Sequence, residues 1–125
     1  GTGCGYQTAV LSKVAKEVLS LERIRPLVMK ARSHLRTLKC NNVKLDHADG
    51  SAGLNAFAPF DGIMVTAAAS HVPQDLLAQL AIGGRMIIPI GTTTQILVLI
   101  ERKANEYVQT KLEAVKFVPL LGGIS

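Results

Sequence analysis

The sequence predicts an α/β fold with a mostly parallel sheet, helices on both faces and an antiparallel hairpin at the C-terminus. Three observations support this prediction. Segments in which apolar residues recur at helical spacing alternate with short apolar runs, which are typical of buried parallel strands. A glycine-rich turn stands directly before the first helical segment. Two β-rich runs follow one another near the end of the chain.

The first half of the chain alternates between helix and strand. Apolar residues recur at helical spacing over 6–16 and again over 24–38, where Pro26 stands near the expected helix start. The apolar run at 18–21 predicts a buried parallel strand, and alternation over 43–47 predicts a second one.

The second half begins with a small, irregular segment at 51–59, which predicts a loop with at most a short helical turn. The remaining expected elements are a strand at 62–66, a short helix at 73–80 ended by Gly83 and Gly84, a strand at 85–90, and a hairpin made of 95–102 and 107–117.

The composition is that of a globular protein, with 48% apolar and 18% charged residues in 125. No apolar run approaches the roughly 18–20 residues that cross a bilayer. The net charge is +5, but there are only two Tyr, three Phe and no Trp to stack on bases. We therefore expect one domain spanning 1–125, located in the cytoplasm, with neither a membrane nor a nucleic acid as partner.

Metal binding and disulfide formation are both disfavoured. The two cysteines, Cys4 and Cys40, are too few and too far apart for a zinc site, and we expect both as reduced thiols. His47 lies near Asp46 and Asp49 in sequence, but strand alternation puts His47 on the face opposite Asp46. The sequence therefore predicts no metal site.

The opening Gly1-Thr2-Gly3-Cys4-Gly5 has the character of a nucleotide-binding turn. Glycine permits a tight turn and a close approach of the backbone to a ligand, and the following helix start offers free N–H groups. The dinucleotide fingerprint has its third glycine one place later, where Tyr6 stands, so the spacing disfavours NAD. The alternative is a flexible terminal tail.

Acidic residues follow the next two strands. Glu22 closes the first strand and can accept both hydroxyls of a ribose, unless it is a surface carboxylate paired with Arg23 or Arg25. Asp49 follows the second strand and can accept the amino group of an adenine, while Gly50 leaves room for the ring. The alternative there is an ordinary Asp-Gly turn.

Together these motifs resemble the protein-L-isoaspartate (D-aspartate) O-methyltransferases, and the bacterial members are the closer likeness. The similarity spans essentially the whole chain, and its later blocks are specific to this family. The matching blocks are Gly-Thr-Gly-Cys-Gly-Tyr-Gln-Thr-Ala-Val-Leu at 1–11, Leu-Glu-Arg-Ile at 21–24, Asp49-Gly50, Pro-Phe-Asp-Gly-Ile-Met-Val-Thr-Ala-Ala at 59–68, Gly-Gly-Arg-Met-Ile-Ile-Pro-Ile-Gly at 83–91 and Val-Lys-Phe-Val-Pro-Leu at 115–120.

The resemblance implies a Rossmann-like methyltransferase fold, S-adenosylmethionine as the cofactor, and isoaspartyl-containing proteins and peptides as substrates of a monomeric enzyme. The reaction would methylate the free carboxylate of an L-isoaspartyl residue, and the ester would then collapse to a succinimide. By this resemblance the cofactor-binding residues are Gly1, Thr2, Gly3, Cys4, Gly5, Glu22, Asp49, Gly50, Thr66 and Ala67, and the substrate-binding residues are Val118, Pro119 and Leu120.

Two departures from the family pattern limit this transfer. Serine usually occupies the place of Cys4, and a strand normally leads into the glycine turn. We therefore expect the chain to be the C-terminal part of a longer protein, with the family's active-site serine before Gly1, so that no catalytic residue can be named here. The alternatives are a catalytically incomplete fragment of that enzyme, or a related Rossmann methyltransferase with a small-molecule or RNA substrate.

Overall fold

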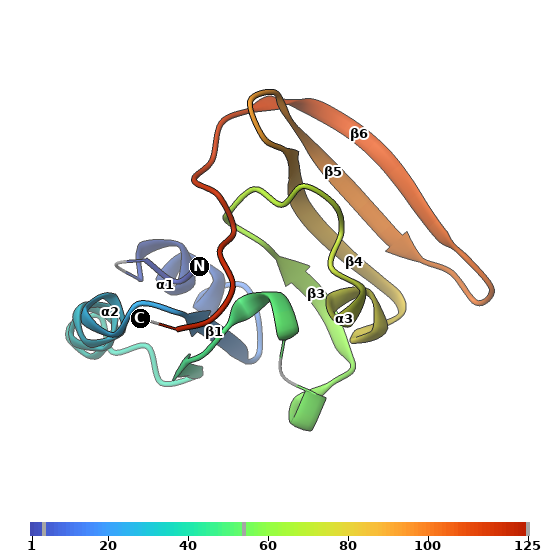
Figure 1. Cartoon of the computed structure of the whole chain (residues 1–125). Coiled ribbons are helices and arrows are strands. Elements are labelled where there is room, and N and C mark those ends of the chain that lie inside the picture. The colour runs from blue at the N-terminus through green and yellow to red at the C-terminus, as the bar shows by residue number, and fades with distance from the viewer. Residues whose placement is uncertain (4, 54, 125) are drawn as a thin grey trace. The chain divides into compact units, whose positions relative to one another are not determined.

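The computed structural model describes residues 1–3, 5–53 and 55–124 (Figure 1). The chain divides into two compact units. Unit 1 consists of Gly1–Gly50 with Gly122–Ser125, and unit 2 consists of Ser51–Leu121. Both units combine helices with strands, so the predicted α/β class is confirmed.

Unit 1 contains two helices and a parallel strand pair. Helix α1 spans Tyr6–Ser12, strand β1 Val18–Glu22, helix α2 Arg25–Thr37 and strand β2 Val43–His47. The two strands pair in register from Val18 opposite Val43 to Glu22 opposite His47. Parallel pairing brings the two strand ends to one edge of the sheet, where Glu22 and the residues after His47 are found.

Helix α1 is shorter than the predicted 6–16 because side chains satisfy its last carbonyl groups. The Ser12 hydroxyl donates to the Ala9 carbonyl at 2.6 Å. The Asn42 amide donates to the carbonyls of Ser12 at 2.8 Å and Ala15 at 3.0 Å. These bonds satisfy carbonyl groups that would otherwise accept the N–H groups of a longer helix.

Helix α2 buries one face, as its spacing predicts. Val28, Ala31 and Leu35 are buried in unit 1. The chain leaves the helix through a left-handed residue, Lys39, which has φ 55°. The N–H of the next residue, Cys40, donates to the Leu35 carbonyl at 3.0 Å. The position of Lys39 normally favours glycine.

Lys39→Gly should therefore stabilise the protein by about 0.5–1 kcal/mol. A left-handed conformation costs a non-glycine residue about 1–2 kcal/mol, and part of that gain is lost to the greater chain entropy of glycine in the unfolded state. Urea unfolding of the complete protein measures the difference. Lys30→Gly, an exposed change within the same helix, should instead destabilise by about 1 kcal/mol. Equal changes in the free energy of unfolding for the two substitutions would contradict the left-handed conformation of Lys39.

Unit 2 is a mixed four-stranded sheet in the order β3-β4-β5-β6. Strand β3 pairs parallel with β4, and the other two pairs are antiparallel, so the predicted C-terminal hairpin is confirmed. The segment predicted as a loop holds two short 3₁₀ turns. The elements are turns at Gly50–Ala52 and Asn55–Phe57, β3 at Phe60–Met64, α3 at Gln74–Ala78, β4 at Leu80–Gly91, β5 at Gln95–Arg102 and β6 at Tyr107–Val115.

The role expected of Gly83 and Gly84 is wrong. Both lie within β4, which begins at Leu80 rather than at 85, and the helix before it ends at Ala78. A Cβ on Gly84 would lie 2.8 Å from the Ala81 carbonyl oxygen, so this glycine permits a tight irregularity inside the strand. The helix stops because Leu80 is completely buried and already pairs with β3.

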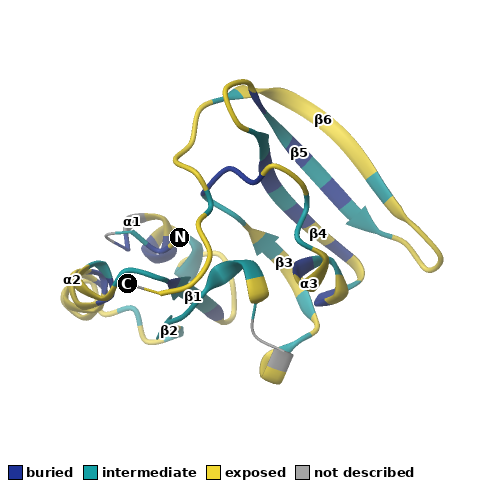
Figure 2. Ribbon diagram, in the orientation of Figure 1, coloured by how far each residue is buried: buried dark blue, intermediate teal, exposed yellow. Residues whose placement is uncertain are grey.

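The core of unit 2 lies against β4 and β5. Buried positions form dark bands along these two strands in Figure 2, whereas β6 is mostly exposed as an edge strand. None of the described helices has the length and hydropathy that crossing a membrane requires. The core consists of Ala69, Leu76, Leu80, Met86, Ile88, Val98 and Ile100.

Candidate functional site

The glycine turn of unit 1 is bound to the end of β1. The amino nitrogen of Gly1 and the N–H of Thr2 both donate to the Leu21 carbonyl, at 2.6 Å and 3.1 Å. The N–H of Gly3 donates to Oε1 of Glu22 at 2.8 Å. The turn is therefore a built part of the fold, and the alternative of a flexible tail is wrong.

Glu22 is held by backbone groups on both oxygens. Besides the Gly3 contact, its Oε2 accepts the N–H of Ile24 at 3.0 Å, and only 5% of the residue is exposed. Glu22 is therefore buried and is not the surface carboxylate of the alternative. A carboxylate has about four acceptor positions, so two N–H donors leave capacity for two hydroxyl groups.

A network of hydroxyl groups on Thr2, Thr8 and Ser20 holds the glycine turn against β1. Oγ1 of Thr2 lies 2.6 Å from Oγ of Ser20, and Oγ1 of Thr8 lies 3.1 Å from the same atom. Thr2 and Thr8 are both buried. Sequence reasoning missed Ser20, although a serine inside the apolar run of β1 was the available signal. Cys4, the remaining non-glycine residue of the turn, lies outside the described residues.

The glycines of the turn serve different purposes. Gly5 has φ 90°, and a Cβ there would lie 3.2 Å from Cβ of Ala31, so Gly5 lets the start of α1 approach α2 closely. Gly3 has φ 58°, and an added Cβ would meet nothing within 4 Å. Gly50 also has open space at its Cβ position. Open space beside the backbone at Gly3 and Gly50 is what a nucleoside ligand requires.

Asp49 follows the end of β2, as the sequence predicts, and its side chain accepts a hydrogen bond within unit 1. Its Oδ2 accepts the N–H of Gly123 at 2.9 Å, which ties the last residues of the chain to unit 1. A carboxylate accepts more than one donor, so this bond is compatible with a second bond to an adenine amino group.

Among the described residues no three His, Cys, Asp or Glu side chains come together as a metal site would require. Nε2 of His47 lies 2.8 Å from the carbonyl oxygen of Arg23.

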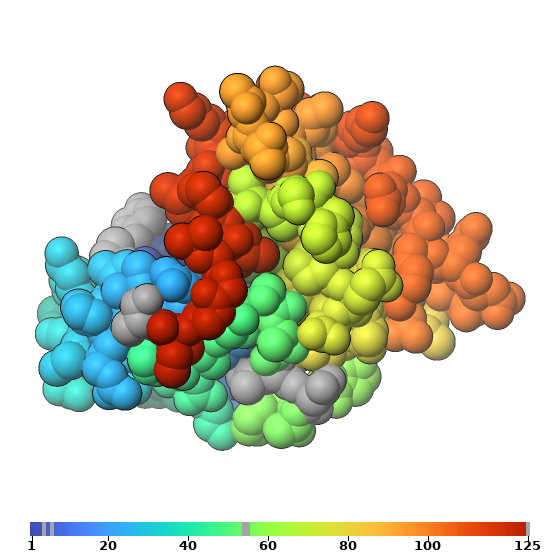
Figure 3. Space-filling model, in the orientation of Figure 1, coloured from blue at the N-terminus to red at the C-terminus, as the bar shows by residue number. Residues whose placement is uncertain are grey.

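Unit 2 brings the predicted Thr66 and Ala67 near the predicted substrate residues. Both follow the end of β3, and the next residue, Ala68, bridges Pro119 in parallel. The Ala68 N–H donates to the Val118 carbonyl and its carbonyl accepts the Leu120 N–H, both at 2.7 Å. In Figure 3 the red segment after β6, residues 116–121 (the tail), lies at the surface beside the yellow-green segment 66–72.

Two of the three predicted substrate residues, Val118 and Leu120, differ in exposure. Val118 is 70% exposed, whereas Leu120 packs against the core of unit 2. The two side chains are two residues apart, so strand alternation does not explain the difference, which comes from the packing of Leu120 against the core. The apolar side chain of Val118 is therefore exposed to solvent, while its backbone carbonyl is fixed by a hydrogen bond.

Sequence reasoning also missed Gln95. This residue opens β5, only 7% of it is exposed, and its side chain bonds the backbone at Phe117. The available signal was a lone amide at the start of an apolar strand, but the partner is 22 residues away in sequence.

Comparison with known proteins agrees with this arrangement. The sequence profile of the family described as Protein-L-isoaspartate(D-aspartate) O-methyltransferase (PCMT) matches residues 1–125. A protein-L-isoaspartate O-methyltransferase of Methylobacillus flagellatus is 71% identical over 98% of this chain, which covers 57% of that protein. The chain thus spans little more than half the length of this curated relative.

Solved structures give the same result. A structure titled protein-L-isoaspartate O-methyltransferase has a TM-score of 0.91 and 32% identity, and the match covers 99% of this chain and 41% of the other. A Plasmodium falciparum protein described as a putative protein-L-isoaspartate O-methyltransferase, in complex with S-adenosyl-L-homocysteine, has a TM-score of 0.82 and 33% identity over 97% of this chain and 63% of the other. The chain belongs to the protein-L-isoaspartate (D-aspartate) O-methyltransferase family.

Proposed function

We propose that the protein carrying this chain transfers a methyl group from S-adenosylmethionine to the free carboxylate of L-isoaspartyl residues in damaged proteins. The observation that carries the proposal is the 71% identity, over 98% of the chain, to a relative named for this activity. The Glu22–Gly3 arrangement supports it independently, because a buried acceptor beside an open glycine turn suits a nucleoside.

The geometry of unit 1 supports the proposed cofactor residues. Glu22 would accept the ribose hydroxyls, and Gly3 would let the backbone approach the ligand. Asp49 and Gly50 would border the adenine. Support comes from the two backbone donors that orient the Glu22 carboxylate, since an acceptor that is already fixed loses little entropy when a ligand binds. Thr66 and Ala67 stay predicted neighbours of the cofactor.

The chemistry needs positioning more than acid–base catalysis. When bound, the cofactor supplies the methyl group from its sulfonium sulfur. The attacking group of the substrate is a carboxylate with a pKa of about 4, which is already ionised near neutral pH and needs no general base. The residues of the protein must therefore align that oxygen and exclude water.

Methylation of a synthetic isoaspartyl peptide with labelled cofactor tests the proposal. The experiment uses the complete protein, with whatever sequence flanks these 125 residues in its gene. We expect a base-labile methyl ester on the isoaspartyl peptide and none on the matched aspartyl peptide. A protein that binds S-adenosylhomocysteine but methylates only a small molecule or RNA would overturn the proposed substrate.

The proposal also covers the domain organisation, the oligomeric state and the location of the enzyme. Residues 1–125 would belong to one methyltransferase domain, which the continuous family match across both units supports. The enzyme would act as a monomer in the cytoplasm. The fragment alternative would be supported if the 125-residue chain bound the cofactor without methylating the peptide while the complete protein did both.

A further inference from the structure

The tail after β6 is held by an unusual combination of contacts. Strand β6 ends at Val115, which pairs with Gln95 at the start of β5. Beyond that pair the side chain of Gln95 replaces the backbone as partner. Its Oε1 accepts the Phe117 N–H at 2.7 Å, and its Nε2 donates to the Phe117 carbonyl at 3.0 Å. One amide thus satisfies both backbone groups of Phe117.

The amide nitrogen of Gln95 makes one further hydrogen bond. Nε2 also donates to the Thr92 carbonyl at 3.2 Å, in the turn between β4 and β5. With 7% of the residue exposed, the amide is shielded from water, where its bonds are stronger and their loss costs more. Gln95 therefore joins the β4–β5 turn to the tail.

The bonds of Gln95 adjoin those of Ala68. Phe117 is fixed by the Gln95 amide, and the next residues are fixed by the two 2.7 Å bonds of Ala68 to Val118 and Leu120. Val118 directly follows Phe117 and accepts the Ala68 N–H through its own carbonyl, while its side chain is 70% exposed. The arrangement presents one apolar group at a defined position.

We propose that Gln95 is a positioning residue for substrate binding: its amide fixes the backbone at 117–118 and so sets where Val118 meets the isoaspartyl peptide. This inference rests on the proposed function and on the predicted contact of Val118 with the substrate. Gln95 itself touches the tail and not the reacting atoms, so its removal should weaken peptide binding and leave the cofactor and the chemical step little changed.

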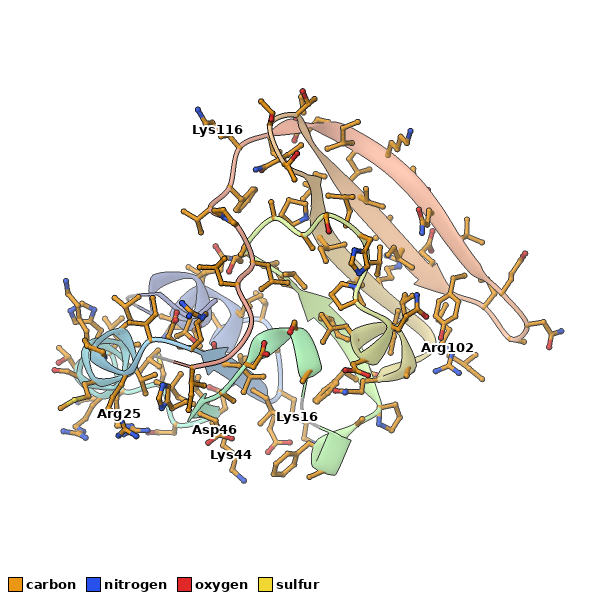
Figure 4. The ribbon with its side chains drawn as sticks, viewed as in Figure 1. Lys16, Arg25, Lys44, Asp46, Arg102 and Lys116 are labelled. Atoms are coloured by element: carbon orange, nitrogen blue, oxygen red, sulfur yellow. The ribbon has the colours of Figure 1, made fainter. Side chains whose placement is uncertain are left out.

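The test compares Gln95→Met with Arg102→Met in the complete protein. Arg102 lies at the other end of β5, as Figure 4 shows by its label and that of Lys116, and its guanidinium donates to the Leu80 carbonyl. Both substitutions remove a bond from a β5 side chain to a carbonyl, but only Gln95 contacts the tail. Arg102→Met therefore controls for a general loss of stability.

We expect Gln95→Met to raise KM for an isoaspartyl peptide about tenfold, which corresponds to about 1.4 kcal/mol. The change in kcat and in KM for S-adenosylmethionine should stay below about twofold. Arg102→Met should leave the peptide KM within about twofold. Gln95→Glu keeps an acceptor for the Phe117 N–H but loses the donors, and it should also raise the peptide KM.

A second readout does not depend on activity. Hydrogen exchange at the Phe117 amide should become at least about tenfold faster in Gln95→Met and stay unchanged in Arg102→Met. Unchanged exchange at Phe117, or a peptide KM raised equally by both substitutions, would overturn the inference. Absence of methylation by the wild-type protein, with faster exchange in Gln95→Met, would overturn the proposed substrate and leave the attachment of the tail to Gln95 supported.

Discussion

Replacement of Glu22 by glutamine should lower the affinity for S-adenosylmethionine by about 100-fold, or about 2.7 kcal/mol. The two carboxylate oxygens accept the N–H groups of Gly3 and Ile24 at 2.8 and 3.0 Å. Glutamine has one acceptor oxygen, so its NH₂ group would face one of these donors. The variant also loses the negative charge that strengthens hydrogen bonds from ribose hydroxyls, each worth about 1.5–3 kcal/mol.

Isothermal titration with S-adenosylmethionine and with S-adenosylhomocysteine measures this loss. Glu17→Gln is the matched control, because it makes the same chemical change on an exposed residue of unit 1. The control should bind like the wild type. A Glu22→Gln protein that binds the cofactor within about threefold of the wild type would remove Glu22 from the proposed site.

Gly3→Ala should lower cofactor affinity at least about tenfold by a different route. The added methyl group meets no protein atom within 4 Å, so any block to binding must come from the ligand side. The backbone cost is separate, because φ 58° is left-handed and costs a non-glycine residue about 1–2 kcal/mol of stability.

Gly83→Ala separates these two effects. Gly83 has φ 84° and likewise has nothing within 4 Å of an added Cβ, but it lies in β4 of unit 2. Both variants should lose similar stability in urea unfolding, and only Gly3→Ala should lose affinity in the titration. Equal affinity in the two variants would mean that the open space at Gly3 is not used by the cofactor.

Local patterns in the sequence were enough to predict most of the helices and strands. The spacing of apolar residues predicts α2 and β1 within about a residue at each end, because one-sided burial leaves its period in the sequence. The glycine turn and Glu22 were expected together since a strand end and the adjacent turn meet at one sheet edge. Their contact at 2.8 Å confirms that they lie together.

The local sequence pattern led to a wrong prediction for two glycines. Gly83 and Gly84 were expected to end a helix, but they lie inside β4, where Gly84 allows the close approach of neighbouring carbonyls. The same residue type serves a helix end, a strand irregularity or a ligand turn, and only the packing around it distinguishes these.

The sequence by itself determined the alternation of elements, the hairpin and the acidic residue beside the glycine turn. Only the tertiary structure decided that Ser20 anchors Thr2 and that Gln95 holds Phe117. The physical reason is that periodicity reports how one element meets its surroundings. A buried hydroxyl or amide instead bonds to whatever backbone the fold brings within reach, and that partner leaves no mark in the local sequence.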